Sequence, residues 1–185
     1  MRAALAMSVM LMVATVAVVA GHPSAAQSSS PTIRLHILVI HGPNMNLLGR
    51  REPQIYGTMT LDQVNARIAD VAKEIDVDLT VLQTNDEAVI VDTFQKHIDD
   101  MDGAIINAAG LSFTAVAIHD VIKAMPFPVI EVHMSNLGTR DEIHQHSILT
   151  PAVRGTVMGL GWHSYTAALR AVAEIVREDR ANKKK

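Results

Sequence analysis

The sequence predicts an α/β fold in which a parallel β-sheet is covered by helices on both faces. Two observations lead to this prediction. Short apolar segments alternate along the chain with longer segments whose apolar residues recur at helical spacing. The short segments are apolar on both faces, which is typical of strands in a parallel sheet buried between helices. The predicted architecture therefore has three layers.

Each strand and helix follows from this pattern. The five predicted strands span residues 35–42, 78–85, 103–110, 128–136 and 154–161. The four predicted helices span residues 60–75, 87–101, 113–125 and 164–179. Thr60 is suited to cap the first helix, and Pro126 ends the third. We expect a flavodoxin-like sheet of five strands with the order 2-1-3-4-5, in which a ligand binds beyond the carboxyl ends of the strands, near strands 1 and 3.

The chain is long enough for one domain with a substantial core, since it has 185 residues of which 49% are hydrophobic. We predict this domain over residues 35–180. Residues 1–26 combine an early positive charge, an apolar run and a small-residue ending, as a signal peptide does. They predict a periplasmic or secreted protein, and an uncleaved membrane anchor is the alternative. Residues 27–34 then form a polar leader, and residues 181–185 a basic tail.

Composition argues against several classes of function. The formal net charge of −3 gives no global basic field for nucleic acid. The chain has no cysteine, so it has neither a disulfide framework nor a thiolate metal site. Once the signal peptide is removed, we expect no membrane partner.

Polar side chains gather where the predicted strands end. In the stretch "EVHMSN", Glu131, His133 and Ser135 share one face of the fourth strand. The first strand runs into the polar loop "HGPNMNLLGRREPQIYG". Other polar residues at this edge are Arg50, Arg51, Tyr56, Asn107, Arg140, His144 and His146. Because the carboxyl ends of parallel strands meet at one edge of the sheet, these residues predict a binding or catalytic site there.

The residues at this edge could support several chemistries. A metal site lacks a tight ligand motif, although side chains of the right kind are present in His41, His133, His144, His146 and Glu131. The loop after the first strand lacks the spacing of a phosphate-binding loop. Ser135 lacks the elbow motif of a nucleophilic serine. The remaining chemistry is acid–base catalysis on a small organic anion.

Four segments carry a resemblance to a known family. They are "GPNMNLLGRREPQIYG", "IINAAG", "VIEVHMSN" and "HSILTPAVRGTVMGLG". Together they resemble type II 3-dehydroquinate dehydratases from Leu35 to about Val176. The resemblance implies a flavodoxin-like fold, a homododecamer built from trimers, and no metal or cofactor. It also implies a hydro-lyase that removes water from 3-dehydroquinate by anti elimination, through an enolate, to give 3-dehydroshikimate.

The same resemblance implies roles for individual residues. Tyr56 would be the base that removes a proton from the carbon beside the ketone, and Arg51 would stabilise its phenolate. Asn44 would hold a water molecule that stabilises the enolate oxygen. His133 would protonate the departing hydroxyl, and Glu131 would orient that imidazole and favour its charged form.

The resemblance also implies a set of substrate-binding residues. Asn107, Ser135 and the backbone near Met134 would hold the substrate carboxylate. Asp120 would contact a neighbouring subunit, and Arg140 would be a loop arginine of the site.

Three positions depart from the pattern of the family. Phe113 stands where a substrate-contacting histidine is expected, His144 where an arginine reaches the ring hydroxyls, and Gly138 where histidine is frequent. Two alternatives therefore stay open: a lyase acting on a related cyclic hydroxy-keto acid, and a non-catalytic envelope protein that binds a carboxylate. An exported enzyme suits quinate catabolism better than a biosynthetic step.

Overall fold

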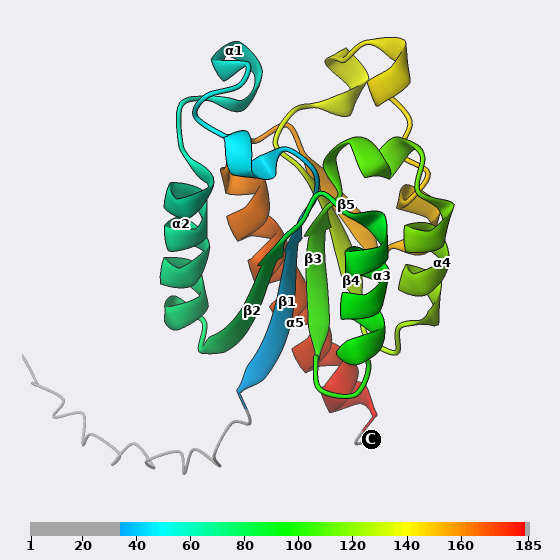
Figure 1. Ribbon diagram of the computed structural model, residues 1–185. Helices are drawn as coiled ribbons and strands as arrows, with labels where there is room; N and C mark the ends of the chain where they lie inside the picture. The colour runs from blue at the N-terminus through cyan, green and yellow to red at the C-terminus, as the bar shows by residue number, and fades with distance from the viewer. Residues whose placement is uncertain (1–33, 184–185) are drawn as a thin grey trace, which may run out of the picture. The chain divides into compact units, whose positions relative to one another are not determined.

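The computed structural model describes residues 34–183, which contain a five-stranded parallel sheet (Figure 1). The strands are β1 (Leu35–His41), β2 (Val77–Gln83), β3 (Gly103–Asn107), β4 (Val129–His133) and β5 (Gly155–Met158). Their order is β2-β1-β3-β4-β5, and every neighbouring pair is parallel. The predicted fold class and strand order are therefore confirmed.

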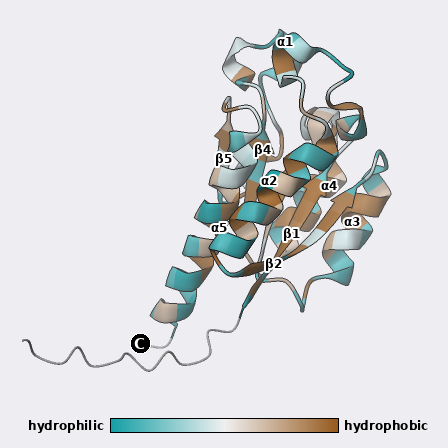
Figure 2. Cartoon of the chain, turned by 90° about the vertical axis from the view of Figure 1, so that its left-hand side faces the viewer, coloured by the Kyte–Doolittle hydropathy of each residue, from teal (hydrophilic) through white to brown (hydrophobic). Residues whose placement is uncertain are grey.

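Helices cover both faces of the sheet, as Figure 1 shows. The α-helices of the described chain are α1 (Pro53–Tyr56), α2 (Leu61–Glu74), α3 (Glu87–Lys96), α4 (Val116–Ala124) and α5 (His163–Asn182). Helices α2 and α5 pack on one face, and α3 and α4 pack on the other. In Figure 2 the strands are largely hydrophobic, while the outward faces of the helices are hydrophilic.

The core has two halves because successive side chains of a strand point to opposite faces. In β1, Ile37 and Val39 belong to the cluster under α2 and α5. Leu38 and Ile40 belong to the cluster under α3 and α4. All four are fully buried, which explains why residues 37–40 of the strand are apolar without alternation of apolar and polar residues.

The helix ends follow local chemistry. Thr60 caps α2, and its side chain forms a capping box with Gln63, as the sequence predicts for an N-cap. Helix α3 ends at Lys96, five residues before the predicted end, because the chain turns at His97. Helix α5 continues to Asn182 and so includes the first two residues of the predicted tail.

The loops at the carboxyl ends of the strands form the end of the domain that carries the site. Helix α1 follows β1 there, and 3₁₀ helices follow β3 (Ala109–Phe113) and β4 (Leu137–Thr139 and Glu142–His144) (Figure 1). Between residues 34 and 183, no helix is both long and apolar enough to cross a membrane. The predicted signal peptide lies outside the described residues.

Candidate active site

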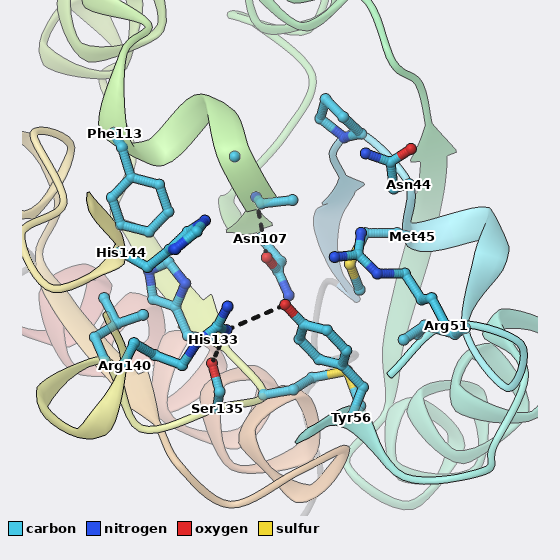
Figure 3. A pocket seen from close by; sticks show the side chains of 16 residues that line it. Asn44, Met45, Arg51, Tyr56, Asn107, Phe113, His133, Ser135, Arg140 and His144 are labelled. Carbon is cyan, nitrogen blue, oxygen red and sulfur yellow. Dashed lines mark hydrogen bonds between the residues drawn. The ribbon is translucent and has the colours of Figure 1, made fainter. Parts of the chain in front are cut away.

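A cavity of about 180 Å³ lies beyond the carboxyl ends of β1, β3 and β4. Its size suits a small organic molecule. Ten of the twelve predicted site residues line it: Asn44, Arg51, Tyr56, Asn107, Phe113, His133, Met134, Ser135, Arg140 and His144 (Figure 3). The structure therefore brings together most of the residues that the sequence predicted for the site, because parallel strands bring their carboxyl ends to one edge.

Tyr56 ends helix α1, and its hydroxyl points into the cavity (Figure 3). The Nη1 atom of Arg140 donates a hydrogen bond to this hydroxyl at 3.1 Å, and the same nitrogen donates to Ser135 Oγ at 3.1 Å. The Arg140 guanidinium also lies 5.8 Å from the centre of the Tyr56 ring. The guanidinium of Arg140 is thus in direct contact with the phenol oxygen.

Arg51 occupies a different place beside the same tyrosine. Its guanidinium lies 5.0 Å from the centre of the Tyr56 ring, and its Nη2 atom pairs with Glu52 at 2.7 Å. The sequence pointed to Arg51 as the partner of the phenolate. In the structure, Arg140 makes the contact with the phenol oxygen, and Arg51 adds a second positive charge next to the ring.

His133 closes the other side of the cavity at the end of β4. Its Nε2 atom lies 2.9 Å from Glu131 Oε1, two residues earlier on the same face of the strand. Because an ionised carboxylate can only accept, Nε2 carries a hydrogen, and Nδ1 is the nitrogen left to exchange a proton. The predicted pairing of Glu131 with His133 is present.

Glu131 is fully buried and accepts hydrogen bonds from four side chains. Its Oε1 accepts from His133 and Ser147, and its Oε2 accepts from Thr150 at 2.8 Å and Thr156 at 3.3 Å. Burial raises the pKa of Glu131, but the hydrogen bonds from His133, Ser147 and Thr150 outweigh burial and leave that pKa below its ordinary value. The carboxylate is thus ionised at neutral pH and accepts a hydrogen bond from the His133 ring.

Asn107 is the last residue of β3 and is almost fully buried. Its carbonyl oxygen accepts from the Gly42 N–H at 2.7 Å, and its Oδ1 accepts from the Ala109 N–H at 3.1 Å. Only glycine fits at position 42, since an added Cβ would lie 2.5 Å from the Ala108 carbonyl oxygen. The loop after β1 therefore fixes the backbone of Asn107.

Asn44 lines the cavity with a left-handed backbone (φ 64°), a conformation that asparagine adopts more readily than most residues. Its N–H donates to Asn85 Oδ1 at 2.9 Å, which ties this loop to the end of β2. The structure agrees with the position predicted for Asn44.

Phe113 and His144 form one wall of the cavity (Figure 3). Their rings meet edge to face at 5.2 Å between centroids, and the Phe113 ring lies 6.4 Å from that of His133. His144 Nδ1 pairs with Asp141 at 2.6 Å, and this hydrogen bond lowers the pKa of Asp141. Two of the three residues that depart from the family pattern are therefore in contact with each other.

Asp120 does not reach the cavity of its own chain. It lies on α4 with 70% of its side chain exposed and pairs with His119 at 2.9 Å. Its predicted contact with a neighbouring subunit stays a prediction. Among the residues that the structure describes, no three or more His, Asp or Glu side chains are grouped in a way that would hold a metal ion.

The sequence missed some residues of the site. The hydroxyls of Ser147, Thr150 and Thr156 hold Glu131. All three lie in the segment "HSILTPAVRGTVMGLG", but the resemblance gave them no role. A buried pair behind the site, His41 and Tyr165, was also missed, because its members are 124 positions apart.

Comparison with known proteins agrees with this geometry. The family model described as "Dehydroquinase class II" matches residues 35–173. The 3-dehydroquinate dehydratase of Gloeothece citriformis is 43% identical over 142 residues, which are 77% of this chain and 93% of that protein. The 3-dehydroquinate dehydratase of Pelotomaculum thermopropionicum is 37% identical over 141 residues, which are 76% of this chain and 98% of that protein.

Solved structures show the same relationship. The type II dehydroquinase from Propionibacterium acnes is 40% identical, with a TM-score of 0.73 over 76% of this chain and 99% of that one. A 3-dehydroquinate dehydratase-like protein from Bifidobacterium longum is 25% identical, with a TM-score of 0.58 over 77% of this chain and 98% of that one. By family model, sequence identity and fold, the chain belongs to the class II dehydroquinase family.

Proposed function

We propose that this protein is a 3-dehydroquinate dehydratase that removes water from 3-dehydroquinate to give 3-dehydroshikimate. The observation that carries the proposal is the pairing of two proton-transfer groups in one cavity. Both Tyr56 and His133 line this cavity. The Tyr56 hydroxyl accepts a hydrogen bond from the Arg140 guanidinium, and the His133 ring is hydrogen-bonded to the buried Glu131 carboxylate. The relatives named 3-dehydroquinate dehydratase support the choice of substrate.

The reaction would begin at Tyr56. Its phenolate, stabilised by Arg140 and Arg51, takes a proton from the carbon beside the ketone, and the electron pair of the broken C–H bond forms an enolate. A water molecule held by Asn44 stabilises the enolate oxygen. The position of Asn44 in the cavity lining supports this role.

His133 would complete the elimination. Its charged ring keeps one N–H on Glu131 and donates the Nδ1 proton to the departing hydroxyl as the C–O bond breaks, so that water leaves and the ring double bond forms. Because Glu131 stays ionised, it offsets the charge of the imidazole without taking its proton. Asn107 and Ser135 would hold the substrate carboxylate.

The direct test follows the appearance of the enone product by its ultraviolet absorbance when purified protein is mixed with 3-dehydroquinate. We expect turnover at an ordinary enzyme rate of ~1–10³ s⁻¹. Arg140→Met keeps much of the side-chain volume but removes the cation from the phenol oxygen, so turnover should fall at least tenfold. Thr139→Ala alters the neighbouring residue, whose hydroxyl donates only to the Asn136 carbonyl, and serves as a matched control. Absence of any product would refute the proposal.

One observation favours a second candidate, a lyase acting on a related cyclic hydroxy-keto acid. Phe113 offers no hydrogen bond to a ring hydroxyl, and the Nδ1 atom of His144 is already paired with Asp141. An unpaired ring hydroxyl costs about 1–3 kcal/mol of binding. A higher kcat/KM for an analogue that lacks the hydroxyl facing Phe113 would favour this candidate.

We also propose an exported, oligomeric enzyme that acts in quinate catabolism. The support for export is the composition of residues 1–26. The support for assembly is α4, on which Val116 (61% exposed) and Asp120 lie one helical turn apart on an exposed face. Sedimentation of the mature protein tests for the dodecamer, and a monomeric mass would contradict it.

A further inference from the structure

A group of buried polar side chains lies next to Asn107 and takes no part in the proposed chemistry. His41, the last residue of β1, is fully buried and is the register partner of Asn107 on β3. Its Nδ1 atom lies 2.9 Å from the Tyr165 hydroxyl, and its Nε2 atom lies 2.8 Å from Asn65 Oδ1. Tyr165 lies in the first turn of α5 and is also fully buried. Such groups are costly to bury unless each finds a partner of the right kind.

The partners set the direction of each hydrogen bond. Asn65 Oδ1 can only accept, so His41 Nε2 must carry the hydrogen. Burial lowers the pKa of His41 to about 4, so the ring is neutral and its Nδ1 is an acceptor. The Tyr165 hydroxyl therefore donates its one hydrogen to His41.

Tyr165 consequently has only its oxygen lone pairs left for Asn107. Burial raises the pKa of Tyr165, while its contact with the Asn107 side chain acts in the opposite direction, as an N–H donor does. Asn107 Oδ1 is already turned toward the Ala109 N–H. The amide oxygen is thus held by the Ala109 N–H, and the amide nitrogen, not the oxygen, faces Tyr165 and the cavity that Asn107 lines.

We propose that His41 and Tyr165 are positioning residues that fix the Asn107 amide with a hydrogen-bond donor toward the substrate carboxylate. An asparagine amide has nearly the same shape in its two orientations, and the flipped form would turn an oxygen toward the carboxylate and repel it. This inference rests on the proposed function, in which Asn107 binds that carboxylate.

Tyr165→Phe tests the inference because it removes the hydroxyl and keeps the ring. We expect KM for 3-dehydroquinate to rise roughly tenfold with little change in kcat, since a contact to the carboxylate is the same in the ground and transition states. Asn107→Ala should raise KM at least as much. The double variant should be no worse than Asn107→Ala alone, because Tyr165 acts through Asn107.

Ser164→Ala is the matched control. Ser164 precedes Tyr165, is fully buried, and accepts from the Leu160 N–H at 3.1 Å. Its loss should lower the melting temperature and leave KM unchanged. The inference is overturned if Tyr165→Phe behaves as Ser164→Ala does, or if the effects of Tyr165→Phe and Asn107→Ala on KM multiply in the double variant.

A measurement on the unmodified protein tests the same inference without turnover. With ¹⁵N-labelled histidine, the spectrum near pH 7 should show a neutral ring with hydrogen on Nε2, and the His41→Gln variant identifies which signal is His41. A charged ring, or hydrogen on Nδ1, would reverse the direction of the Tyr165 hydrogen bond and overturn the inference. If the protein did not convert 3-dehydroquinate at all, the proposed function would fail, and this spectrum would still decide the direction of the hydrogen bond between His41 and Tyr165.

Discussion

Acidification from pH 6.5 to pH 4 is expected to weaken the fold through one buried side chain, His41. Burial lowers the pKa of this histidine in the folded chain from 6.5 to about 4. Between these values the unfolded chain binds a proton that the folded chain does not, so the free energy of unfolding falls as the pH falls. Above pH 6.5 the contribution of neutral His41 to the free energy of unfolding is fully present, and it is lost as the pH approaches 4.

The size of the effect follows from the two pKa values. At about 1.4 kcal/mol for each pH unit, the interval from 6.5 to about 4 corresponds to roughly 3 kcal/mol. A domain of this size loses about 2–4 °C in melting temperature for each kcal/mol, so the midpoint should fall by roughly 10 °C. Glu131, whose pKa is lowered from 4.5, adds its own loss at more acidic pH.

Urea unfolding measures this effect, with the fluorescence of Trp162 as the probe. The chain has one tryptophan, and it packs partly buried against the core. Protein concentration must be the same at each pH, because assembly changes apparent stability. His41→Gln cannot take up a proton, so its stability should change much less over this interval. The reasoning would be refuted if both proteins lost the same stability between pH 6.5 and 4.

Three further predictions concern catalysis and export. Tyr56→Phe should lower kcat by about 10²–10⁴-fold without altering the circular dichroism spectrum, and a variant with near-normal turnover would show that Tyr56 is not the base. Phe113→His combined with His144→Arg should raise kcat/KM for 3-dehydroquinate roughly tenfold, but not for an analogue without ring hydroxyls; an equal gain on both would contradict a role in reading hydroxyls. Protein expressed from Met1 in a bacterial host should carry a new N-terminus near Gln27 by intact mass, whereas an uncleaved chain in the membrane fraction would favour the anchor.

Sheet order and helix faces were predictable because they depend on periodic patterns spread over many residues. The apolar strands are signals of this kind. The N-cap at Thr60 was predictable from a local signal, the residue type just before an apolar helical pattern. Helix α1 and the 3₁₀ helices were not predicted, since segments of three to five residues carry no period. The end of α3 was placed too late because its apolar spacing continues beyond the turn at His97.

The membership of the site was largely predictable, but its contacts were not. Strand ends bring Asn107 and His133 to one edge whatever their side chains do. Which arginine reaches Tyr56 depends on how a loop 84 positions later folds back, and the sequence favoured the nearer Arg51 over Arg140. The hydrogen-bond partners of Glu131 were not predicted either, because they are distant in sequence. Thr156, for example, lies on β5, 25 positions after Glu131.

The residues of the cavity come from two kinds of element, a strand of the sheet and short helices outside it. Glu131 and His133 belong to β4, whose backbone is bonded to β3 on one side and β5 on the other. Phe113 and His144 belong to short 3₁₀ helices outside the sheet. Replacement of these wall residues leaves the strand register untouched. The wall of the cavity can therefore change in shape and polarity while Glu131 and His133 keep their places on β4.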